Sequence, residues 1–227
     1  MRTRNIFILF TMLALHLSAC TDIEDGTTDI DSWPAINEYT LAHPCMLHTA
    51  ADLSYVASKL TVAPWSEGYD KLKNSGYSYA GYVPTPQEVL GRMDQGNWAS
   101  KFPEWWNNYT YFYKDAAAAY QLALRWKLEG DVACGQTAVK ILNAWAETCK
   151  GLVRVKSLAN DRTYDANGEI ADPNEYLISI NVHQMANAAE IMRTDETLFT
   201  KAQLSAFQTM MKNVFYPAAS DFLAHKE

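Results

Sequence analysis

The chain has 227 residues, of which 48% are hydrophobic, so it holds enough apolar side chains for one sizeable core. Its formal net charge of −7 argues against nucleic acid as a partner, because binding to phosphates needs a basic surface. Aromatic residues make up 12% of the chain, which suits either a core or a surface on which sugar rings stack.

The N-terminus predicts an export signal rather than part of the fold. Arg2 and Arg4 precede an apolar run over residues 6–17 that is too short to span a bilayer as a permanent anchor. The run ends in Leu-Ser-Ala-Cys, which resembles a bacterial lipobox, whose cysteine becomes the acylated first residue of the mature protein. We therefore expect residues 1–20 to be a lipoprotein signal peptide and Cys20 to carry the lipid.

Residues 21–40 predict an acidic tether and linker, because they begin with the polar stretch TDIEDGTTDIDS. The folded domain is expected over residues 41–227. Residues 1–32 hold five acids and two bases, so the remainder, with 21 acids and 17 bases, has a net charge of only −4. These features predict an exported protein that is lipid-anchored to the outer membrane and faces the periplasm or the cell surface.

Two short helices are predicted after the tether. Thr49, with Asp52 three residues later, is typical of a residue that caps a helix N-terminus. Pro64 is expected in the first turn of a second helix, which should stop at Gly76. Residues 76–104 mix glycine, proline and aromatic residues without a period, and irregular stretches of this length are more often functional than idle. We expect them to form a rim loop.

The strongest helical pattern follows this loop. A helix is predicted over residues 109–128, a tight break at Gly130, and a second helix over residues 131–149. Helices joined so closely form an antiparallel hairpin. One side of the second helix is expected to be apolar through Val132, Val139, Leu142 and Trp145.

The last part of the chain predicts two more helices. An irregular stretch over residues 151–173 precedes a helix over residues 180–193, and a final helix runs from its cap Thr200 to Phe215, with Pro217 following it. We find no convincing strand pairs. Successive helical hairpins with long loops at one end predict an all-α fold, and an (α/α) toroid or barrel rather than a four-helix bundle.

Four segments carry a resemblance to a known family: HPCMLHTAADLSYVASKL, PWSEGYDKL, YFYKDAAAAYQLALRWKLEGDVACGQTAVKILNAWAE and NVHQMANAAEIMR. In this order they resemble the alginate lyase superfamily of polysaccharide lyases, and most closely its Bacteroides-type all-α members, similar to polysaccharide lyase family 38. The likeness covers roughly residues 41–225. It implies an incomplete (α/α) toroid of antiparallel helical hairpins. It also implies a C-terminally truncated sequence, because family members are considerably longer.

The resemblance implies a reaction as well, the cleavage of a polyuronate by β-elimination. In alginate lyases a tyrosine acts as the base, while asparagine or glutamine, histidine and arginine side chains neutralise the uronate carboxylate. The base tyrosine and its arginine are expected beyond residue 227, which leaves open whether this chain is active alone. An anionic polysaccharide is the expected partner, and no metal or other cofactor is expected.

The helix over residues 180–193 supplies the first site candidates. At 100° per residue, Asn181 and Gln184 fall on the apolar face, whereas His183 falls on the polar face beside Glu190. Buried amides are costly unless they are used, so Asn181 and Gln184 are candidates for binding the substrate carboxylate or for tying helix to helix. His183 is a catalytic candidate, and the alternative is a solvated histidine.

A second set of candidates lies where the rim loop meets the helix at residue 109. Trp105, Asn107, Asn108 and Tyr109 combine aromatic rings with amides, which suits a substrate-binding subsite for a sugar. The alternative is that one of the asparagines caps the helix while the tryptophan belongs to the core.

Three cysteines remain besides Cys20. Cys134 and Cys149 cannot pair with each other, because a continuous helix with a rise of about 1.5 Å per residue would hold them roughly 22 Å apart. Cys45 is free or pairs with one of them. No spacing of histidines and cysteines predicts a structural metal.

Three functions compete. The favoured one is a polysaccharide lyase acting on alginate, polymannuronate or glucuronan. A glycoside hydrolase on the same toroid would need two facing carboxylates, for which the loops offer Asp94, Glu104, Asp161 and Asp172. A surface glycan-binding lipoprotein would share the export signal and the tryptophan-rich loops without catalytic groups.

Overall fold

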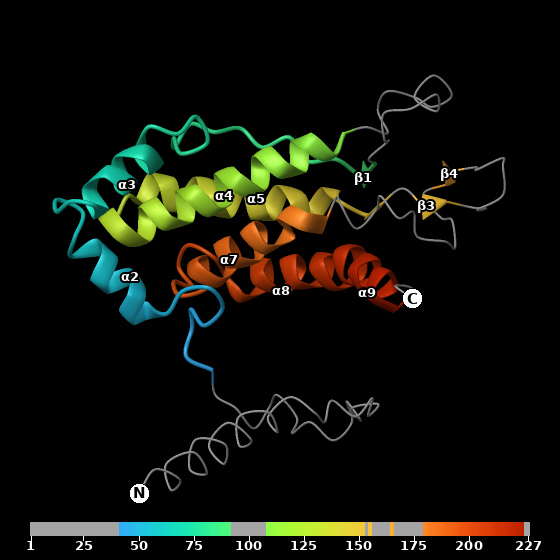
Figure 1. The fold of residues 1–227 in the computed structure, drawn as a ribbon. Coiled ribbons are helices and arrows are strands. Elements are labelled where there is room, and N and C mark those ends of the chain that lie inside the picture. The colour runs from blue at the N-terminus through green and yellow to red at the C-terminus, as the bar shows by residue number, and fades with distance from the viewer. Residues whose placement is uncertain (1–40, 92–107, 153, 156–163, 166–178, 225–227) are drawn as a thin grey trace, which may run out of the picture. The chain divides into compact units, whose positions relative to one another are not determined.

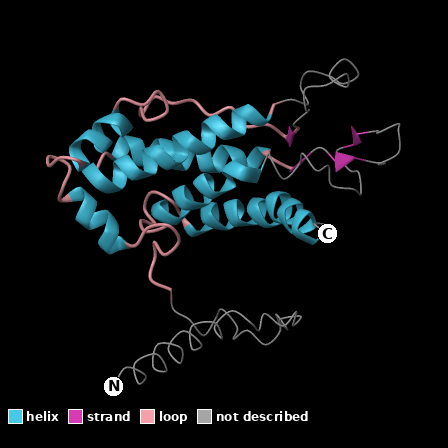
Figure 2. Ribbon diagram, in the orientation of Figure 1, coloured by secondary structure: helices cyan, strands magenta, loops and turns pink. Residues whose placement is uncertain are grey.

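The computed structural model describes residues 41–91, 108–152, 154–155, 164–165 and 179–224. Apart from Leu41 they fall within a single unit, Ala42–Glu227, and the expected signal peptide, tether and Cys20 lie outside the described residues. The unit is mostly helical, which confirms the all-α class (Figures 1 and 2). Its helices are α2 (Ala50–Ala57), α3 (Trp65–Lys73), α4 (Tyr109–Glu129), α5 (Val132–Thr148), α7 (Val182–Met192), α8 (Lys201–Met210) and α9 (Tyr216–Ala224), with a 3-10 turn η5 (Ser179–Asn181) and a π-helical turn η6 (Met211–Phe215).

Helices α4 and α5 form the antiparallel hairpin that the sequence predicts. Gly130 ends α4 with a left-handed backbone (φ 77°), and its N–H donates to the carbonyl of Trp126. Asp131 then caps α5, because its carboxylate accepts a hydrogen bond from the Cys134 N–H at 3.1 Å. A residue with a Cβ atom is strained at positive φ, which explains the glycine at this turn.

Helices α7 and α8 pack against this hairpin. Helix α7 contacts α4, and α8 contacts α5. In Figure 1, α4 and α7 begin at the same end of the bundle and run in the same direction, while α5 and α8 return in the opposite direction. Alternating antiparallel helices are common to bundles and toroids. The toroid therefore stays a prediction.

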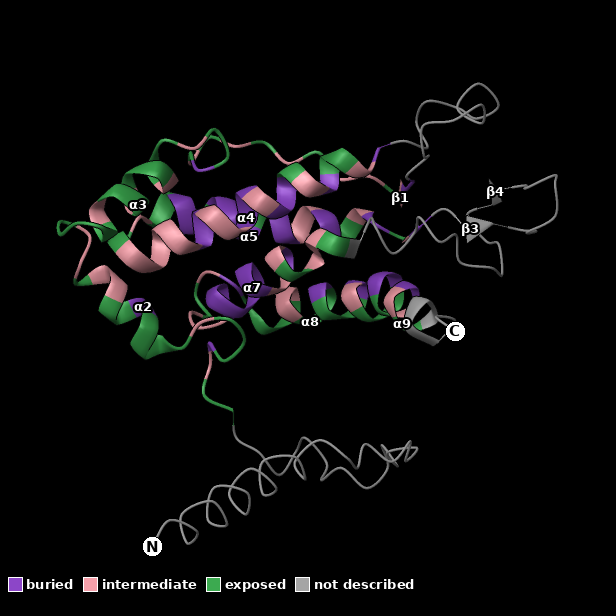
Figure 3. Ribbon diagram, in the orientation of Figure 1, coloured by how far each residue is buried: buried purple, intermediate pink, exposed green. Residues whose placement is uncertain are grey.

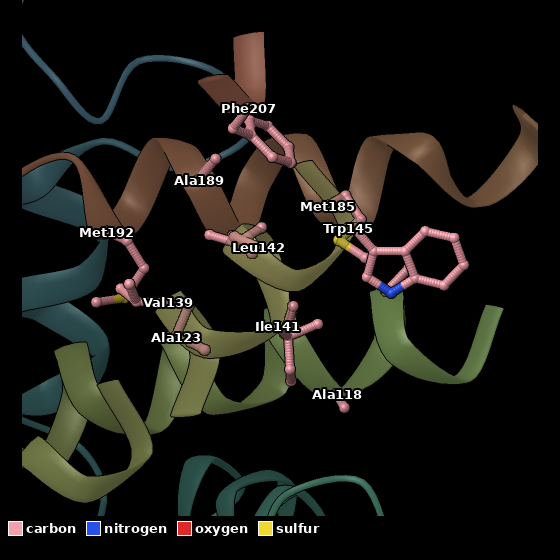
Figure 4. Packing of buried hydrophobic residues seen from close by; sticks show 14 of the residues in the cluster. Ala118, Ala123, Val139, Ile141, Leu142, Trp145, Met185, Ala189, Met192 and Phe207 are labelled. Atoms are coloured by element: carbon pink, nitrogen blue, oxygen red, sulfur yellow. The ribbon is translucent and has the colours of Figure 1, made fainter. Parts of the chain in front are cut away.

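The core lies where α4, α5, α7 and α8 meet (Figure 4). Small residues on α4, such as Ala118 and Ala123, are fully buried and let the neighbouring helices approach closely. Trp145 on α5 is also fully buried, and its ring meets Phe112 edge to face at a centroid distance of 5.1 Å. Buried positions gather on α4, α5 and α7, whereas α2 and α3 are mostly exposed or half-buried (Figure 3).

A buried carboxylate, Asp115 on α4, ties the preceding irregular segment to this core. It accepts hydrogen bonds at 2.7 Å from the Trp145 indole N–H, from the Tyr82 hydroxyl and from the Thr85 backbone N–H. Burial and the hydrogen bond to Asp115 raise the pKa of the Tyr82 hydroxyl. Part of the expected rim loop, residues 76–91, is therefore fixed by specific polar contacts, and the rest of it lies outside the described residues.

Both predicted threonine caps are confirmed. The Thr49 side chain accepts from the Asp52 N–H, and the Thr200 side chain accepts from the Gln203 N–H, so each forms a complete capping box. The prediction for the helix at Pro64 was wrong in its bounds. Pro64 is the cap before Trp65, and α3 ends at Lys73 rather than at residue 76, because the backbone turns at residues 74–75.

The apolar side of α5 is confirmed except at its first residue. Val139, Leu142 and Trp145 are buried, but Val132 is 52% exposed. Val132 comes two residues after Gly130, directly after the cap Asp131, so it stands at the end of the hairpin rather than between the helices.

The prediction that the last helix stops before Pro217 was wrong. The chain passes from α8 through the π-helical turn η6 into α9, and Pro217 is the second residue of α9. Proline has no N–H and collides with the preceding turn of a regular helix. The Tyr216 N–H donates to the carbonyl of Met211, five residues back, so the wider turn before Pro217 replaces the regular bonding pattern.

Two strand pairs contradict the prediction of none, although each strand has only two residues. Strand β1 (Val89–Leu90) pairs in parallel with β2 (Gly151–Leu152), and β3 (Arg154–Val155) pairs antiparallel with β4 (Tyr164–Asp165). A two-residue strand is too short for an alternating pattern to be recognised in the sequence.

Candidate functional site

The described site candidates gather at one end of the helical unit. Asn108 and Tyr109 stand at the start of α4, and Asn181, His183 and Gln184 stand at the start of α7. Helix α4 contacts η5, and the starts of α4 and α7 lie toward the same side in Figure 1. We call this region the loop end. Two further candidates, Trp105 and Asn107, lie outside the described residues.

His183 is exposed and held in one orientation by the backbone. Its Nδ1 lies 2.7 Å from the Ile180 carbonyl oxygen. A carbonyl oxygen only accepts, so this hydrogen bond forms when Nδ1 carries the proton. In the neutral ring Nε2 then has a free lone pair that can take a proton, and in the charged ring Nε2–H can donate to an anion.

Asn181 and Gln184, which flank His183 in the sequence, form a half-buried amide pair with each other. The Gln184 Nε2 donates to the Asn181 Oδ1 at 3.1 Å. Asn181 precedes α7 without capping it through its side chain. Within the described part of the chain, the Asn181 amide nitrogen and the Gln184 carbonyl oxygen keep their hydrogen-bonding capacity for a further partner. The apolar face predicted for this helix is confirmed by the burial of Met185, Ala188 and Met192.

Asn108 is a buried link between α4 and the loop before it. Its Oδ1 accepts from the Gly91 N–H at 2.9 Å, and its Nδ2 donates to the Val89 carbonyl at 3.0 Å and to Gln87 Oε1 at 3.3 Å. It precedes α4 but makes no side-chain capping bond. The adjacent Tyr109 is half-buried, so sugar stacking at the start of α4 stays a prediction that rests on Tyr109 rather than on the occupied amide of Asn108.

A polar cluster that the sequence did not predict lies farther along α7. The carboxylate of Glu190 is buried. Its Oε1 lies 2.5 Å from His43 Nδ1 and also accepts a hydrogen bond from the Cys45 N–H at 3.0 Å. Its other oxygen, Oε2, is 3.3 Å from Arg193 Nη1. Burial alone would raise the pKa of Glu190, but the hydrogen bonds from His43 and Cys45 lower it below its ordinary value of 4.5.

The segment that holds His43 and Cys45 continues through Leu47 and His48 and covers more of the polar side of α7. The Leu47 N–H donates to Asn187 Oδ1 at 3.2 Å, and Asn187 is buried. His48 Nε2 contacts the hydroxyl of Tyr120 on α4, and burial lowers the pKa of His48. Three polar residues lie on this side of α7. His183 is exposed, whereas Asn187 and Glu190 are buried. The covering residues stand more than 130 positions earlier, so no local pattern around Glu190 could have identified them.

The structure decides between a free Cys45 and a disulfide to one of the other two described cysteines. Cys45, Cys134 and Cys149 are all free, with Cys45 exposed and the other two buried. Burial raises the pKa of Cys149 to about 11. Burial and the neighbouring Asp131 together raise the pKa of Cys134 to about 12. Thiols with such pKa values stay protonated at neutral pH and are poor nucleophiles.

A groove of about 760 Å³ runs between α7, α8 and η6. Its walls are mainly apolar and include Met46, Leu204, Phe207, Met211 and Phe215, and the charged Glu190 and Arg193 also line it. A uronate polymer carries a charge and several hydroxyls on every ring, so this groove suits it less well than the polar loop end.

Comparisons of the chain with protein-family models, with curated proteins and with solved structures found no match. Among the described helices, none combines the length and the apolar character needed to cross a bilayer.

Proposed function

We propose that the protein is a polysaccharide lyase that cleaves a uronate-containing polymer, alginate, polymannuronate or glucuronan, by β-elimination. The observation that carries the proposal is that the exposed His183 ring and the half-buried Asn181–Gln184 amide pair both stand at the start of α7, at the loop end of the helical unit. These residue types match those that the resemblance to the alginate lyase superfamily assigns to carboxylate neutralisation.

The reaction explains why such groups are needed together. A base removes the proton at C5 of the uronate, the electrons form the C4–C5 double bond, and the C4–O bond to the leaving sugar breaks. An acid gives a proton to the leaving oxygen. Negative charge builds on the uronate carboxylate when the C5 proton departs, so donors aimed at that carboxylate lower the barrier.

The side chains of α7 suit this stabilising role. The Asn181 amide nitrogen supplies neutral donors, and a protonated His183 supplies a charged Nε2–H donor. In its neutral form, His183 can instead receive a proton at Nε2. We assign Asn181 and Gln184 to carboxylate binding and His183 to a catalytic role, with Tyr109 in the neighbouring sugar subsite.

The architecture that we propose for this lyase is an incomplete (α/α) toroid, in which the parallel starts of α4 and α7 form one wall of a cleft. The chain would be exported and anchored to the outer membrane through a lipid on Cys20, where it would meet an anionic polysaccharide. Its own side chains supply donors at the loop end, and the proposed reaction uses no cofactor.

Product analysis separates this function from its rivals. Full-length protein is incubated with alginate and with glucuronan, and both ultraviolet absorbance and reducing ends are measured. A lyase produces an absorbing C4–C5 double bond with each new reducing end. A hydrolase produces reducing ends alone, and a binding protein produces neither. Reducing ends without absorbance, or no product from either polymer, would overturn the proposal.

A further inference from the structure

The cluster on α7 brings three different metal-binding side chains together at the surface. His43 Nδ1, Cys45 Sγ and Glu190 Oε1 all lie within 4.8 Å of one another. His43 Nδ1 is 3.4 Å from Cys45 Sγ, and Cys45 Sγ is 3.3 Å from Glu190 Oε1. Two of these residues come from the segment before α2 and the third from α7, so a shared ligand would join the two segments.

We propose that His43, Cys45 and Glu190 bind a divalent transition-metal ion, with Zn²⁺ as the expected occupant. In a tetrahedral zinc site with bonds of about 2.0–2.3 Å, neighbouring ligand atoms lie roughly 3.3–3.6 Å apart. The two separations that involve Cys45 Sγ already match this spacing. The 2.5 Å contact between His43 and Glu190 must open by roughly 1 Å as the ion replaces their hydrogen bond.

Charge and ligand chemistry also favour zinc. A thiolate from Cys45 and the carboxylate of Glu190 together neutralise a divalent ion. Arg193 pairs with Glu190 Oε2, which leaves Oε1, the oxygen that contacts His43 and Cys45, to bind the ion. Sulfur and imidazole ligands favour zinc over calcium or magnesium, which prefer oxygen. Cys45 is exposed, which leaves room for a water molecule as the fourth ligand.

The ion displaces the thiol proton when it binds. Zinc binding forms the Zn–S bond and releases that proton to solvent, with no change of oxidation state. The site lies away from the start of α7 and is independent of the proposed lyase reaction. Its effect is structural, because it fixes residues 43–48 on α7.

A cobalt titration tests the site. Full-length protein is stripped of metal with a chelator and titrated with Co²⁺, which reports sulfur ligation through a thiolate-to-cobalt absorption band. We expect this band in the wild type, its displacement by Zn²⁺ but not by Mg²⁺ or Ca²⁺, and its loss in Cys45→Ser. Cys134→Ser, which alters a buried cysteine on α5, should keep the band. A wild type without the band, or a Cys45→Ser variant that keeps it, would overturn the proposal.

Alkylation of the wild type gives an answer that needs no variant. Cys45 is exposed and therefore accessible to iodoacetamide, while the buried Cys149 serves as an internal control. With free Zn²⁺ at ten times its dissociation constant, labelling of Cys45 should slow roughly tenfold, because only the metal-free fraction reacts. Peptide mapping identifies the labelled cysteine. Equal labelling of Cys45 with and without Zn²⁺ would contradict a site at this cluster, even if Cys45→Ser failed to fold.

Discussion

The imidazole of His43 lies 2.5 Å from the carboxylate of Glu190, across a sequence separation of 147 residues. This contact fixes the segment before α2 on the side of α7 that would otherwise face solvent. It also explains how a helix can bury a glutamate, because that carboxylate meets His43, the Cys45 N–H and Arg193 at once. A buried charge is tolerated when it is paired and hydrogen-bonded in this way.

Glu190→Gln should lower the free energy of unfolding by about 1–3 kcal/mol at neutral pH, because the amide cannot replace the charged partner of His43 and Arg193. The folded-state pKa of Glu190 lies below its ordinary value of 4.5. Its contribution is therefore complete above that value and is lost as the pH falls through the folded-state pKa. Urea denaturation between about pH 7 and pH 3 should show the gap between wild type and variant closing on acidification.

The control for this series is Glu196→Gln, an exposed glutamate paired with Lys201 at 3.3 Å. We expect its effect to stay within about 0.5 kcal/mol, because exposed ion pairs contribute little. A Glu190→Gln gap that stays constant down to the lowest pH would contradict the assigned role of the carboxylate.

Asp115→Ala should cost about 2–4 kcal/mol of stability. It leaves the Trp145 indole, the Tyr82 hydroxyl and the Thr85 N–H without their acceptor inside the protein. Denaturant unfolding measures the loss, and near-ultraviolet circular dichroism reports the packing of the tryptophans. Asp70→Ala on the exposed surface of α3 is the matched control and should change stability little. A similar cost for both variants would mean that Asp115 holds no network together.

Two glycine substitutions should have opposite signs. Gly130→Ala places a Cβ at φ 77° and should destabilise the protein by about 1–2 kcal/mol. Gly68→Ala lies inside α3, where nothing within 4 Å would meet the new Cβ, and should stabilise by roughly 0.5–1 kcal/mol. Thermal unfolding of both variants decides the matter. A stabilising Gly130→Ala would contradict the left-handed turn between α4 and α5.

The parts of the fold that local chemistry controls could be predicted from the sequence. The threonine caps of α2 and α8 and the glycine turn after α4 depend on residues within a few positions of each other. The apolar face of α7 follows from helical periodicity in the same way. The continuation through Pro217 was missed because it depends on a π-helical turn, which proline alone does not indicate.

Only the part of the candidate site that depends on local helical periodicity could be predicted from the sequence. Periodicity separated His183 from the Asn181–Gln184 pair, and the structure keeps that separation while placing all three at the loop end. It could not predict the cover over Asn187 and Glu190, which comes from a segment more than 130 residues earlier. Periodicity also could not predict that the Asn108 side chain hydrogen-bonds to the backbone of Gly91 and Val89, because those bonds close an irregular loop.

The most direct test of the proposed function is the initial rate of double-bond formation by full-length wild-type protein and by His183→Ala, on alginate and on glucuronan. We predict an unsaturated product from at least one polymer and a loss of rate of roughly 10²–10⁴-fold in the variant. Lys140→Ala, on the exposed side of α5, should match the wild type. No unsaturated product from either polymer, or an unchanged rate in His183→Ala, would contradict a lyase site at the start of α7.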